Sequence, residues 1–191
     1  MPRVVVLAGI NGAGKTTAAP RLLADVLRIP TFVNADAIAR GLNGLHPEAE
    51  AFRAGRVMLD QLNDLARRRE DFAFETTLSA RTYAPWLAAL RPTGYEVLLY
   101  YYWLRSPELA IARVATRVQS GGHFVPDADI RRRYARSVRN FLELYRPIAD
   151  EWEVYDNTED PRTLLAIGTP DDELIDDPDT WAAFLRSADD A

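Results

Sequence analysis

Apolar and polar positions follow two rhythms along the chain, short continuous apolar runs and longer stretches with apolar residues three or four apart. The apolar runs predict strands at residues 4–7, 31–33, 71–74, 95–104 and 152–155, the last being the final strand. The helical spacing predicts helices at residues 17–27, 47–69, 82–91 and 106–120, and a long helix that Asp127 caps and Pro147 ends. Alternating strands and helices favour a parallel sheet with helices on both faces. We therefore predict one α/β domain over residues 1–191, with the 95–104 strand at its centre.

Three apolar stripes predict which helix faces pack on the sheet. The 47–69 helix has a stripe of Ala51, Ala54, Met58, Leu62 and Leu65. The long helix has one of Ile130, Tyr134, Val138, Phe141, Leu142 and Tyr145. Residues 158–191 form an acidic C-terminal appendage, in which Trp181, Phe184 and Leu185 predict a small helix docked on the core.

The first predicted strand runs into Gly9-Ile10-Asn11-Gly12-Ala13-Gly14-Lys15-Thr16, which fits the phosphate-loop pattern G-x-x-x-x-G-K-[ST]. Glycines let backbone N–H groups approach a polyphosphate closely, and the helix that follows directs its N-terminus at the anion. We expect Lys15 to reach the outer phosphates and the Thr16 hydroxyl to bind Mg²⁺. The order strand, glycine loop, helix disfavours an ordinary glycine turn. The predicted nucleotide-binding residues of this loop are Asn11, Gly12, Ala13, Gly14, Lys15, Thr16 and Thr17.

Composition narrows the class of protein. Of the 23 basic residues only Lys15 is a lysine, and the chain has no cysteine for a disulfide or a thiolate metal site. Residues 1–149 carry a net charge of +7 and residues 150–191 a net charge of −12. A positive body suits a nucleotide, whereas the acidic end makes nucleic acid an unlikely partner. Without a signal peptide or a membrane-spanning apolar run, we expect a cytoplasmic protein.

Polar residues follow three of the predicted strands, at the sheet edge where α/β proteins bind ligands. Asp36, Glu75 and Asn157 stand there, on the same edge as the phosphate loop. We predict that Asp36 is the general base for an attacking hydroxyl, although it could instead cap the following segment. Glu75 is expected to contact the substrate or Mg²⁺ rather than to be a surface acid. Asn157 is expected to contact the nucleotide.

A basic helical lid is predicted at about residues 113–136. Arg113 and Arg117 share a helix face and could stack on the nucleotide base and clamp its phosphates. Arg131, Arg132 and Arg133 begin the next helix, and each of them is equally well explained as solvent-exposed. Arg132 points farthest from the apolar stripe. His123 lies between the two helices, and the spacing of the two histidines gives no metal-site signal.

The absences exclude two classes of phosphate-loop protein. A GTPase of the usual kind needs a lysine in its N-K-x-D motif, and the chain has no second lysine. The 97–103 strand lacks the terminal aspartate of motor and transporter ATPases. A small ATP-dependent kinase remains, which would work by positioning and charge stabilisation. Two alternatives stay open: an ATP-binding switch or interaction module, and a kinase of another metabolite or of a nucleic-acid end. ADP production that an acceptor stimulates would separate a kinase from a switch.

Several segments together resemble the zeta-toxin family of small phosphate-loop kinases. They are residues 8–17, Phe32–Asp36, Phe74–Ser79, Gly121–His123, Ile130–Tyr134 and Tyr155–Asn157. The resemblance implies phosphoryl transfer from ATP to UDP-N-acetylglucosamine, at the 3′-hydroxyl of its amino sugar. It would make Asp36 the base and Arg117 and Arg132 the phosphate clamp. Glu75, Thr76, Thr77, Arg81 and His123 would be acceptor contacts, and a small antitoxin protein would be a typical partner.

Overall fold

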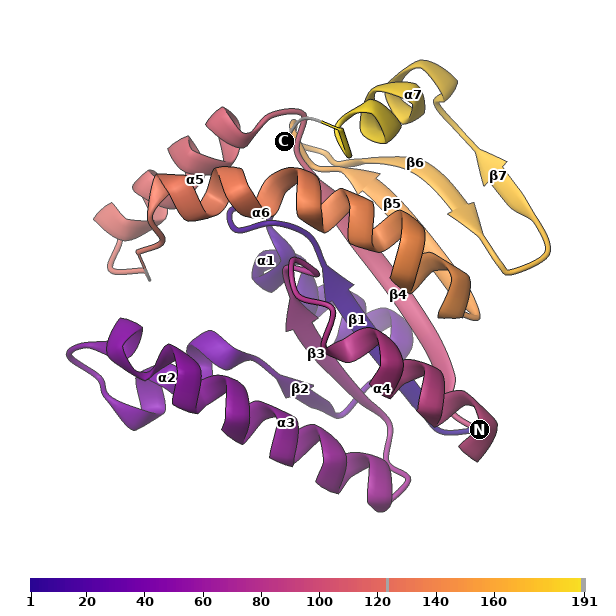
Figure 1. The fold of residues 1–191 in the computed structure, drawn as a ribbon, viewed down its shortest axis with the longest axis horizontal. Helices are drawn as coiled ribbons and strands as arrows, with labels where there is room; N and C mark the ends of the chain where they lie inside the picture. Colours follow the sequence, from indigo (N-terminus) through magenta and orange to yellow (C-terminus); the bar gives the residue numbers. More distant parts are fainter. Residues whose placement is uncertain (123, 190–191) are drawn as a thin grey trace.

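The computed structural model describes residues 1–122 and 124–189 and has a seven-stranded mixed sheet at its centre (Figure 1). The strand order is β2-β3-β1-β4-β5-β6-β7. The strands are β1 Arg3–Ala8, β2 Thr31–Val33, β3 Phe72–Thr76, β4 Glu96–Trp103, β5 Glu151–Asp156, β6 Thr163–Gly168 and β7 Glu173–Ile175. The first five are parallel, and β6 and β7 are antiparallel to their neighbours. The predicted parallel sheet is thus confirmed, with β4 in the middle.

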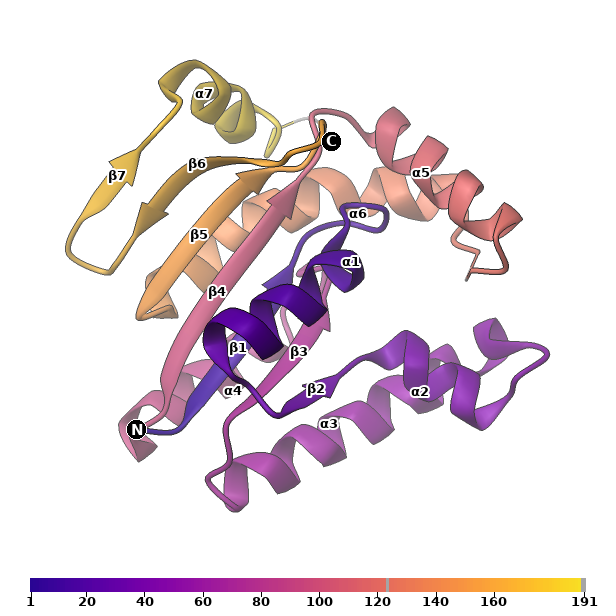
Figure 2. The same cartoon turned by 180° about the vertical axis from the view of Figure 1, so that it is seen from behind.

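Helices cover both faces of the sheet (Figures 1 and 2). The α-helices are α1 Lys15–Pro20, α2 Ala35–Leu42, α3 Ala51–Arg67, α4 Tyr83–Leu90, α5 Pro107–Gln119, α6 Asp127–Asn140 and α7 Pro178–Arg186. Two α-helices continue as π-helices, Arg21–Leu27 after α1 and Phe141–Tyr145 after α6. Short 3₁₀ turns lie at Pro47–Glu50, Arg91–Thr93 and Arg146–Ile148.

Each face of the sheet has its own apolar core. Apolar side chains of α3, α4, α6 and α7 pack on one face around the fully buried Phe72, Phe74 and Phe141. Helices α1 and α5 and the first turns of α6 pack on the other face around Leu7 and Tyr102. The continuous apolar runs of β1 and β4 reflect this, because their residues are buried alternately in one core and in the other.

Most predicted stripes are confirmed, and the exceptions lie at element ends. Ala54, Met58, Leu62 and Leu65 are buried, but Ala51 is exposed at the start of α3. Trp181 and Phe184 dock α7 on the core, whereas Leu185 is 38% exposed. The prediction of residues 152–155 as the final strand is wrong, because β6 and β7 extend the sheet beyond β5.

Two helix starts differ from the sequence prediction. Helix α2 was not predicted, and its N-cap is Asn34, whose Oδ1 accepts a hydrogen bond of 3.0 Å from the Ala37 N–H. Asp36 therefore lies in the first turn of α2 and is not its cap. Asp127 is the first residue of α6 and not its cap, since the cap position belongs to Pro126. The difference at α2 arises because Asn34 and Asp36 are equally good caps by sequence alone.

Candidate functional site

The loop between β1 and α1 turns sharply at glycines whose backbone angles other residues rarely adopt. Gly9 and Gly14 have φ angles of 131° and 83°. A Cβ on Gly9 would lie 2.1 Å from the Tyr102 carbonyl oxygen, and one on Gly14 would lie 2.4 Å from Asn157 Nδ2. Asn157 holds the loop from outside, donating a hydrogen bond of 2.9 Å to the Ala13 carbonyl oxygen. The glycines are thus required by both backbone angle and space, as the motif predicts.

The side chain of Lys15 folds back into the phosphate loop. This side chain is 5% exposed, and its Nζ donates a hydrogen bond of 2.9 Å to the Ile10 carbonyl oxygen. Burial lowers the pKa of the Lys15 ammonium, while the nearby Glu75 and Asp36 carboxylates act against that shift. A buried ammonium held by one carbonyl and a carboxylate at 3.6 Å is well placed to bind anionic oxygens.

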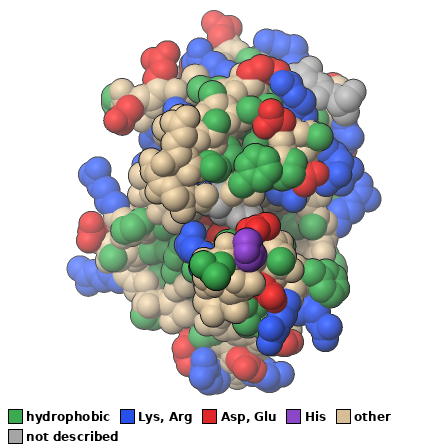
Figure 3. Space-filling model, turned by 90° about the vertical axis from the view of Figure 1, so that its left-hand side faces the viewer, with side chains coloured by type: hydrophobic (Ala, Val, Ile, Leu, Met, Phe, Trp, Pro, Cys, Tyr) green, Lys and Arg blue, Asp and Glu red, His purple; other side chains and the backbone are tan. Residues whose placement is uncertain are grey.

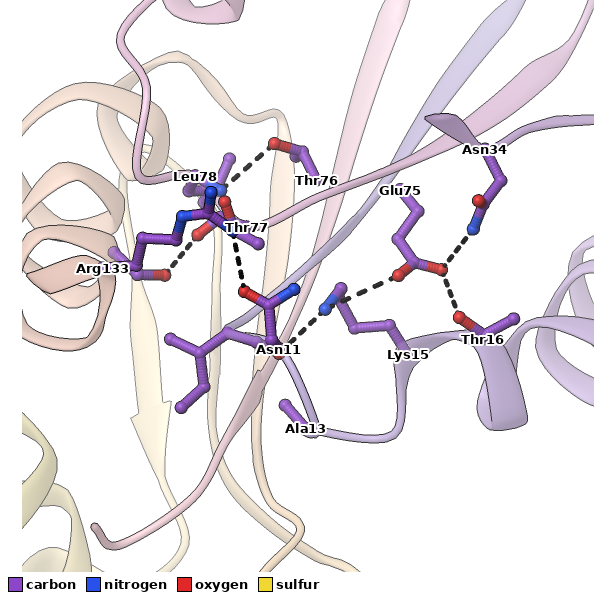
Figure 4. Close-up of polar contacts among 12 residues, drawn as sticks. Asn11, Ala13, Lys15, Thr16, Asn34, Glu75, Thr76, Thr77, Leu78 and Arg133 are labelled. Atoms are coloured by element: carbon purple, nitrogen blue, oxygen red, sulfur yellow. Dashed lines mark hydrogen bonds and ion pairs between the residues drawn. The ribbon is translucent and has the colours of Figure 1, made fainter. Parts of the chain in front are cut away.

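Glu75 connects the loop to the neighbouring strands (Figure 4). Its Oε2 accepts hydrogen bonds of 2.7 Å from Thr16 Oγ1 and 2.9 Å from Asn34 Nδ2, and its Oε1 lies 3.6 Å from Lys15 Nζ. The Thr16 hydroxyl and the Glu75 carboxylate are hard oxygen donors side by side, which suits Mg²⁺ bound mainly by phosphates and water. In the described part of the chain no three His, Cys, Asp or Glu residues could hold a metal by themselves.

A hollow of about 200 Å³, the inner hollow, opens in front of Lys15. Its lining consists of Asn11, Lys15, Asn34, Ala35, Asp36, Met58, Glu75, Thr76, Thr77, Tyr83, Arg117 and Arg133. Figure 3 shows the face of the molecule that is hollowed between the part with α2 and α3 and the part with α5 and α6. The predicted site residues Lys15, Asp36, Glu75 and Arg117 therefore meet in one place.

A second hollow of about 370 Å³, the outer hollow, lies on the other side of the phosphate loop. It is lined by Gly12, Gly14, Thr17, Ala18, Arg113, Asn157, Glu159, Asp160 and Arg162. The Arg113 guanidinium is fixed there by hydrogen bonds of 2.7 Å and 2.9 Å to the carbonyl oxygens of Asn157 and Thr158. Arg113 and Arg117, predicted to act together, thus line different hollows.

The arginines at the start of α6 differ from the prediction. Arg133 lines the inner hollow, and its Nη1 donates a hydrogen bond of 3.2 Å to Asn11 Oδ1. Arg132, which the resemblance implies as a clamp, pairs with Asp129 at 2.8 Å and does not line the inner hollow. The hollow faces the flank of the apolar stripe and not the side opposite to it, where Arg132 points.

Only some of the remaining residues predicted to contact the acceptor line the inner hollow. Thr76 and Thr77 line the inner hollow, whereas Arg81 is exposed and does not. His123 lies outside the described residues. Tyr83 and Met58, which sequence reasoning missed, form part of the wall, with the Tyr83 hydroxyl donating to Met58 Sδ at 3.6 Å.

Helix α6 holds the segment Thr76–Ala80, which we call the acceptor loop. Ser137 Oγ donates to the Thr77 carbonyl oxygen at 2.5 Å, and Asn140 Nδ2 donates to the Leu78 carbonyl oxygen at 2.6 Å. One turn further, the Tyr145 hydroxyl donates to the Ala80 carbonyl oxygen at 2.8 Å. Leu78 has a φ of 54°, a strained value for a non-glycine residue.

Arg133, Ser137 and Asn140 are four and then three residues apart, so one face of α6 carries all three. The same face thus reaches the inner hollow through Arg133 and holds the acceptor loop through Ser137 and Asn140. Sequence reasoning missed the roles of Ser137 and Asn140, although two polar residues beside an apolar stripe were a usable signal. Their side chains are 0% and 1% exposed.

Solved structures share this fold at low sequence identity. A chain of the AvrRxo1-ORF1:ORF2 complex with ATP matches with a TM-score of 0.75 and 14% identity, over 98% of this chain and 64% of that one. A chain of the PezAT chromosomal toxin-antitoxin system of Streptococcus pneumoniae matches with a TM-score of 0.62 and 19% identity, over 87% and 72%. Shikimate kinase of Acinetobacter baumannii, in complex with shikimate, matches with a TM-score of 0.50 and 19% identity, over 80% and 82%. The fold is thus that of phosphate-loop kinases, and this chain spans less than two thirds of the first of these chains.

The sequence itself has a bacterial relative and a family. It is 28% identical over 132 residues to an uncharacterized protein of Haemophilus influenzae, and the match covers 69% of this chain and 92% of that protein. No helix in the described part is both long and apolar enough to span a bilayer. The model of the AAA domain family matches residues 4–139, which include the phosphate loop, Asp36, Glu75 and both arginines of the inner hollow. The chain therefore belongs to the AAA domain family and has a phosphate-loop kinase-like fold.

Proposed function

We propose that this protein is an ATP-dependent kinase that transfers the γ-phosphoryl group of ATP to a hydroxyl of a small acceptor. The observation that carries the proposal is the convergence of Lys15, Asp36, Glu75, Arg117 and Arg133 in one hollow beside the phosphate loop. A binding module needs the loop and its lysine. A carboxylate facing the phosphate position across a hollow is what a transferase needs in addition.

Under this proposal the two hollows divide the substrates. The outer hollow, between Arg113 and the 157–162 segment, takes the nucleoside of ATP. The phosphate loop carries the triphosphate toward the inner hollow, where Lys15, Arg117 and Arg133 stabilise the negative charge of the transferred group. Their positive charge is in place before the reaction, so little reorganisation is needed during transfer.

Asp36 acts as the general base for the acceptor hydroxyl. Its carboxylate lines the inner hollow and makes no hydrogen bond or ion pair with another of the described residues, so it is available to accept a proton. Thr76 and Thr77 orient the hydroxyl from the other wall. Thr16 and Glu75 would hold Mg²⁺, which would neutralise part of the phosphate charge.

The acceptor and a partner are finer proposals. UDP-N-acetylglucosamine is the candidate acceptor that the resemblance to zeta toxins implies. A small antitoxin protein is the corresponding candidate partner, supported by the fold shared with a chain of the PezAT toxin-antitoxin system. Neither candidate is required by the chemistry of the site, and each needs a direct binding measurement with the purified protein.

The experiment that tests the kinase proposal is Asp36→Asn. Loss of the base should lower acceptor-dependent ADP production by about a hundredfold or more, with the affinity for ATP unchanged by calorimetry. Asp60→Asn, at an exposed position of α3, is the matched control and should retain full activity. Full acceptor phosphorylation by Asp36→Asn would remove Asp36 from the mechanism, and failure of the unaltered protein to bind ATP would end the kinase proposal itself.

A further inference from the structure

The cations and the carboxylates that line the inner hollow come from different elements of the fold. All three cations come from the phosphate loop and the two helices above it, namely Lys15, Arg117 of α5 and Arg133 of α6. The opposite side, built by β3 and helices α2 to α4, has no cation among its described lining residues and carries the two carboxylates, of which Glu75 pairs with Lys15 at 3.6 Å and Asp36 lies in the first turn of α2. Its residues are Asn34, Ala35, Asp36, Met58, Glu75, Thr76, Thr77 and Tyr83.

The cations already have a role in the proposed reaction. The terminal phosphates of ATP bring several negative charges to the loop, and Lys15, Arg117 and Arg133 lie on that side. An acceptor must occupy the remaining, carboxylate-bearing side. There a carboxylate or phosphate on the acceptor would face Asp36 with no basic side chain of that side to pair with, which disfavours it strongly.

The neutral polar groups on this side suit hydroxyl and amino groups. The Tyr83 hydroxyl directs its proton at Met58 Sδ, and Thr76 Oγ1 accepts from the Leu78 N–H at 3.1 Å. Tyr83 therefore presents oxygen lone pairs to the hollow, and Asp36 presents a carboxylate. Hydroxyl and ammonium groups donate to such oxygens, whereas an anion only accepts.

Size limits the acceptor further. The inner hollow has a volume of about 200 Å³, below the roughly 300–1,000 Å³ typical of pockets that enclose drug-sized ligands. A single sugar ring or a comparable polyol fits this space together with the transferred phosphoryl group. A sugar nucleotide would need to place its diphosphate along the carboxylate side.

We infer that the acceptor is a small polyhydroxylated molecule that is uncharged or carries an amine, and that carboxylated, phosphorylated and nucleotide-linked acceptors are rejected. This inference rests on the proposed kinase function and narrows its candidates, because it argues against UDP-N-acetylglucosamine. The juxtaposition that carries it is a phosphate side with three cations facing an acceptor side that has the Asp36 carboxylate and no cation among its described residues.

The test separates a small-metabolite extract by ion exchange into cationic, neutral and anionic pools. Each pool is incubated with the full chain, Mg²⁺ and ATP labelled in its γ-phosphoryl group, and labelled products are identified by mass spectrometry. Labelling in the neutral or cationic pool is expected. Labelling chiefly in the anionic pool, or faster labelling of UDP-N-acetylglucosamine than of free N-acetylglucosamine, overturns the inference and leaves the kinase function intact. Labelling in no pool overturns it as well, and calorimetry with ATP then shows whether nucleotide binding has also failed.

A pair of variants on one helical turn tests the charge argument directly. Ala35 lines the inner hollow, whereas Ala37 is exposed and does not. Ala35→Lys should lower phosphorylation of the neutral or cationic acceptor by at least about tenfold relative to any anionic acceptor, because it adds a cation to the acceptor side. Ala37→Lys should leave this preference unchanged, with both melting temperatures recorded as a check on folding. An unchanged preference in a folded Ala35→Lys variant would contradict the charge argument.

Discussion

The phosphate loop and the acceptor loop are both short turns at the end of a parallel strand, yet they are held in opposite ways. The phosphate loop follows β1, and most of its fixed geometry comes from its own glycines and from Lys15, which bonds back to Ile10. The acceptor loop follows β3 and has no glycine. It is held by Ser137, Asn140 and Tyr145, which lie 60 to 65 residues away in the sequence.

The contrast explains which residues specify the conformation of each loop. A loop held mainly by its own residues must be specified mainly by contiguous residues, so a motif describes it, although Asn157 adds one hydrogen bond from outside. A loop held by a distant helix has no such restriction, and its strained Leu78 persists because buried donors of α6 bind the neighbouring carbonyl groups. Substitutions that alter one loop and spare the other therefore test the contrast.

The largest effect is expected from Lys15→Ala. Removing the buried ammonium should lower phosphoryl transfer by about 10²–10³-fold and weaken ATP binding, because no other cation lies within the loop. The free energy of unfolding should stay the same or rise, since burial already disfavours the charged form of Lys15. Calorimetry with ATP and denaturant unfolding measure the two effects. Arg21→Ala, at an exposed position of the following π-helix, is the control, and equal losses in both variants would contradict the assignment.

A smaller but sharper effect is expected from comparing Arg133→Ala with Arg132→Ala. Arg133 lines the inner hollow, so its loss should lower the turnover rate by about tenfold to a hundredfold. Arg132 forms an exposed pair with Asp129, so its loss should change the rate by less than about twofold. Steady-state kinetics on both variants decide the matter, and the reverse order would favour Arg132, the clamp that the resemblance implies.

Altering the α6 clamp should affect the acceptor and spare ATP. Ser137→Ala removes a hydrogen bond to the partly buried Thr77 carbonyl and another to the buried Tyr101 hydroxyl, which costs about 1–3 kcal/mol of stability and loosens the acceptor loop. We expect the Michaelis constant for the acceptor to rise by about three- to tenfold, with the constant for ATP unchanged. Val138→Ala removes a buried side chain of the same helix at a similar cost of about 2 kcal/mol and is the matched control. Equal kinetics in the two variants would make Ser137 merely structural.

The smallest effect at ordinary pH concerns Tyr145. Burial raises the pKa of its hydroxyl to about 12, above the value of about 10 expected in the unfolded chain. The folded state therefore keeps the proton more tightly, so this stabilisation is complete below pH 10 and is lost as the pH rises toward 12. Denaturant unfolding at pH 9 and pH 11 should show the decrease. Tyr145→Phe should show a smaller decrease, and an identical slope in the two proteins would exclude this tyrosine as a cause.

The sequence predicted the donor half of the site far better than the acceptor half. Gly9, Gly14, Lys15 and Thr16 were identified because a phosphate cradle needs particular residues at particular spacings. Helix α2 was missed because it has only 8 residues and therefore few apolar positions from which to recognise a helical spacing. The apolar stripe showed that Arg132 points away from the core but could not show which arginine lines the inner hollow, because a helical wheel gives angles around one helix and not the position of the neighbouring loop.

The order of amino acids alone establishes an alternating α/β fold, a phosphate loop after the first strand and a carboxylate near the end of the second. The packing of the folded chain is needed to show that α6 fixes the acceptor loop, that Arg133 and not Arg132 enters the inner hollow, and that cations and carboxylates face each other across it. The physical reason is distance along the chain. The backbone conformation of a loop and the spacing of apolar residues in a helix or strand depend on residues that are close in the sequence. The side-chain contacts that shape a pocket join residues far apart in the sequence, and these meet only when the whole molecule has packed.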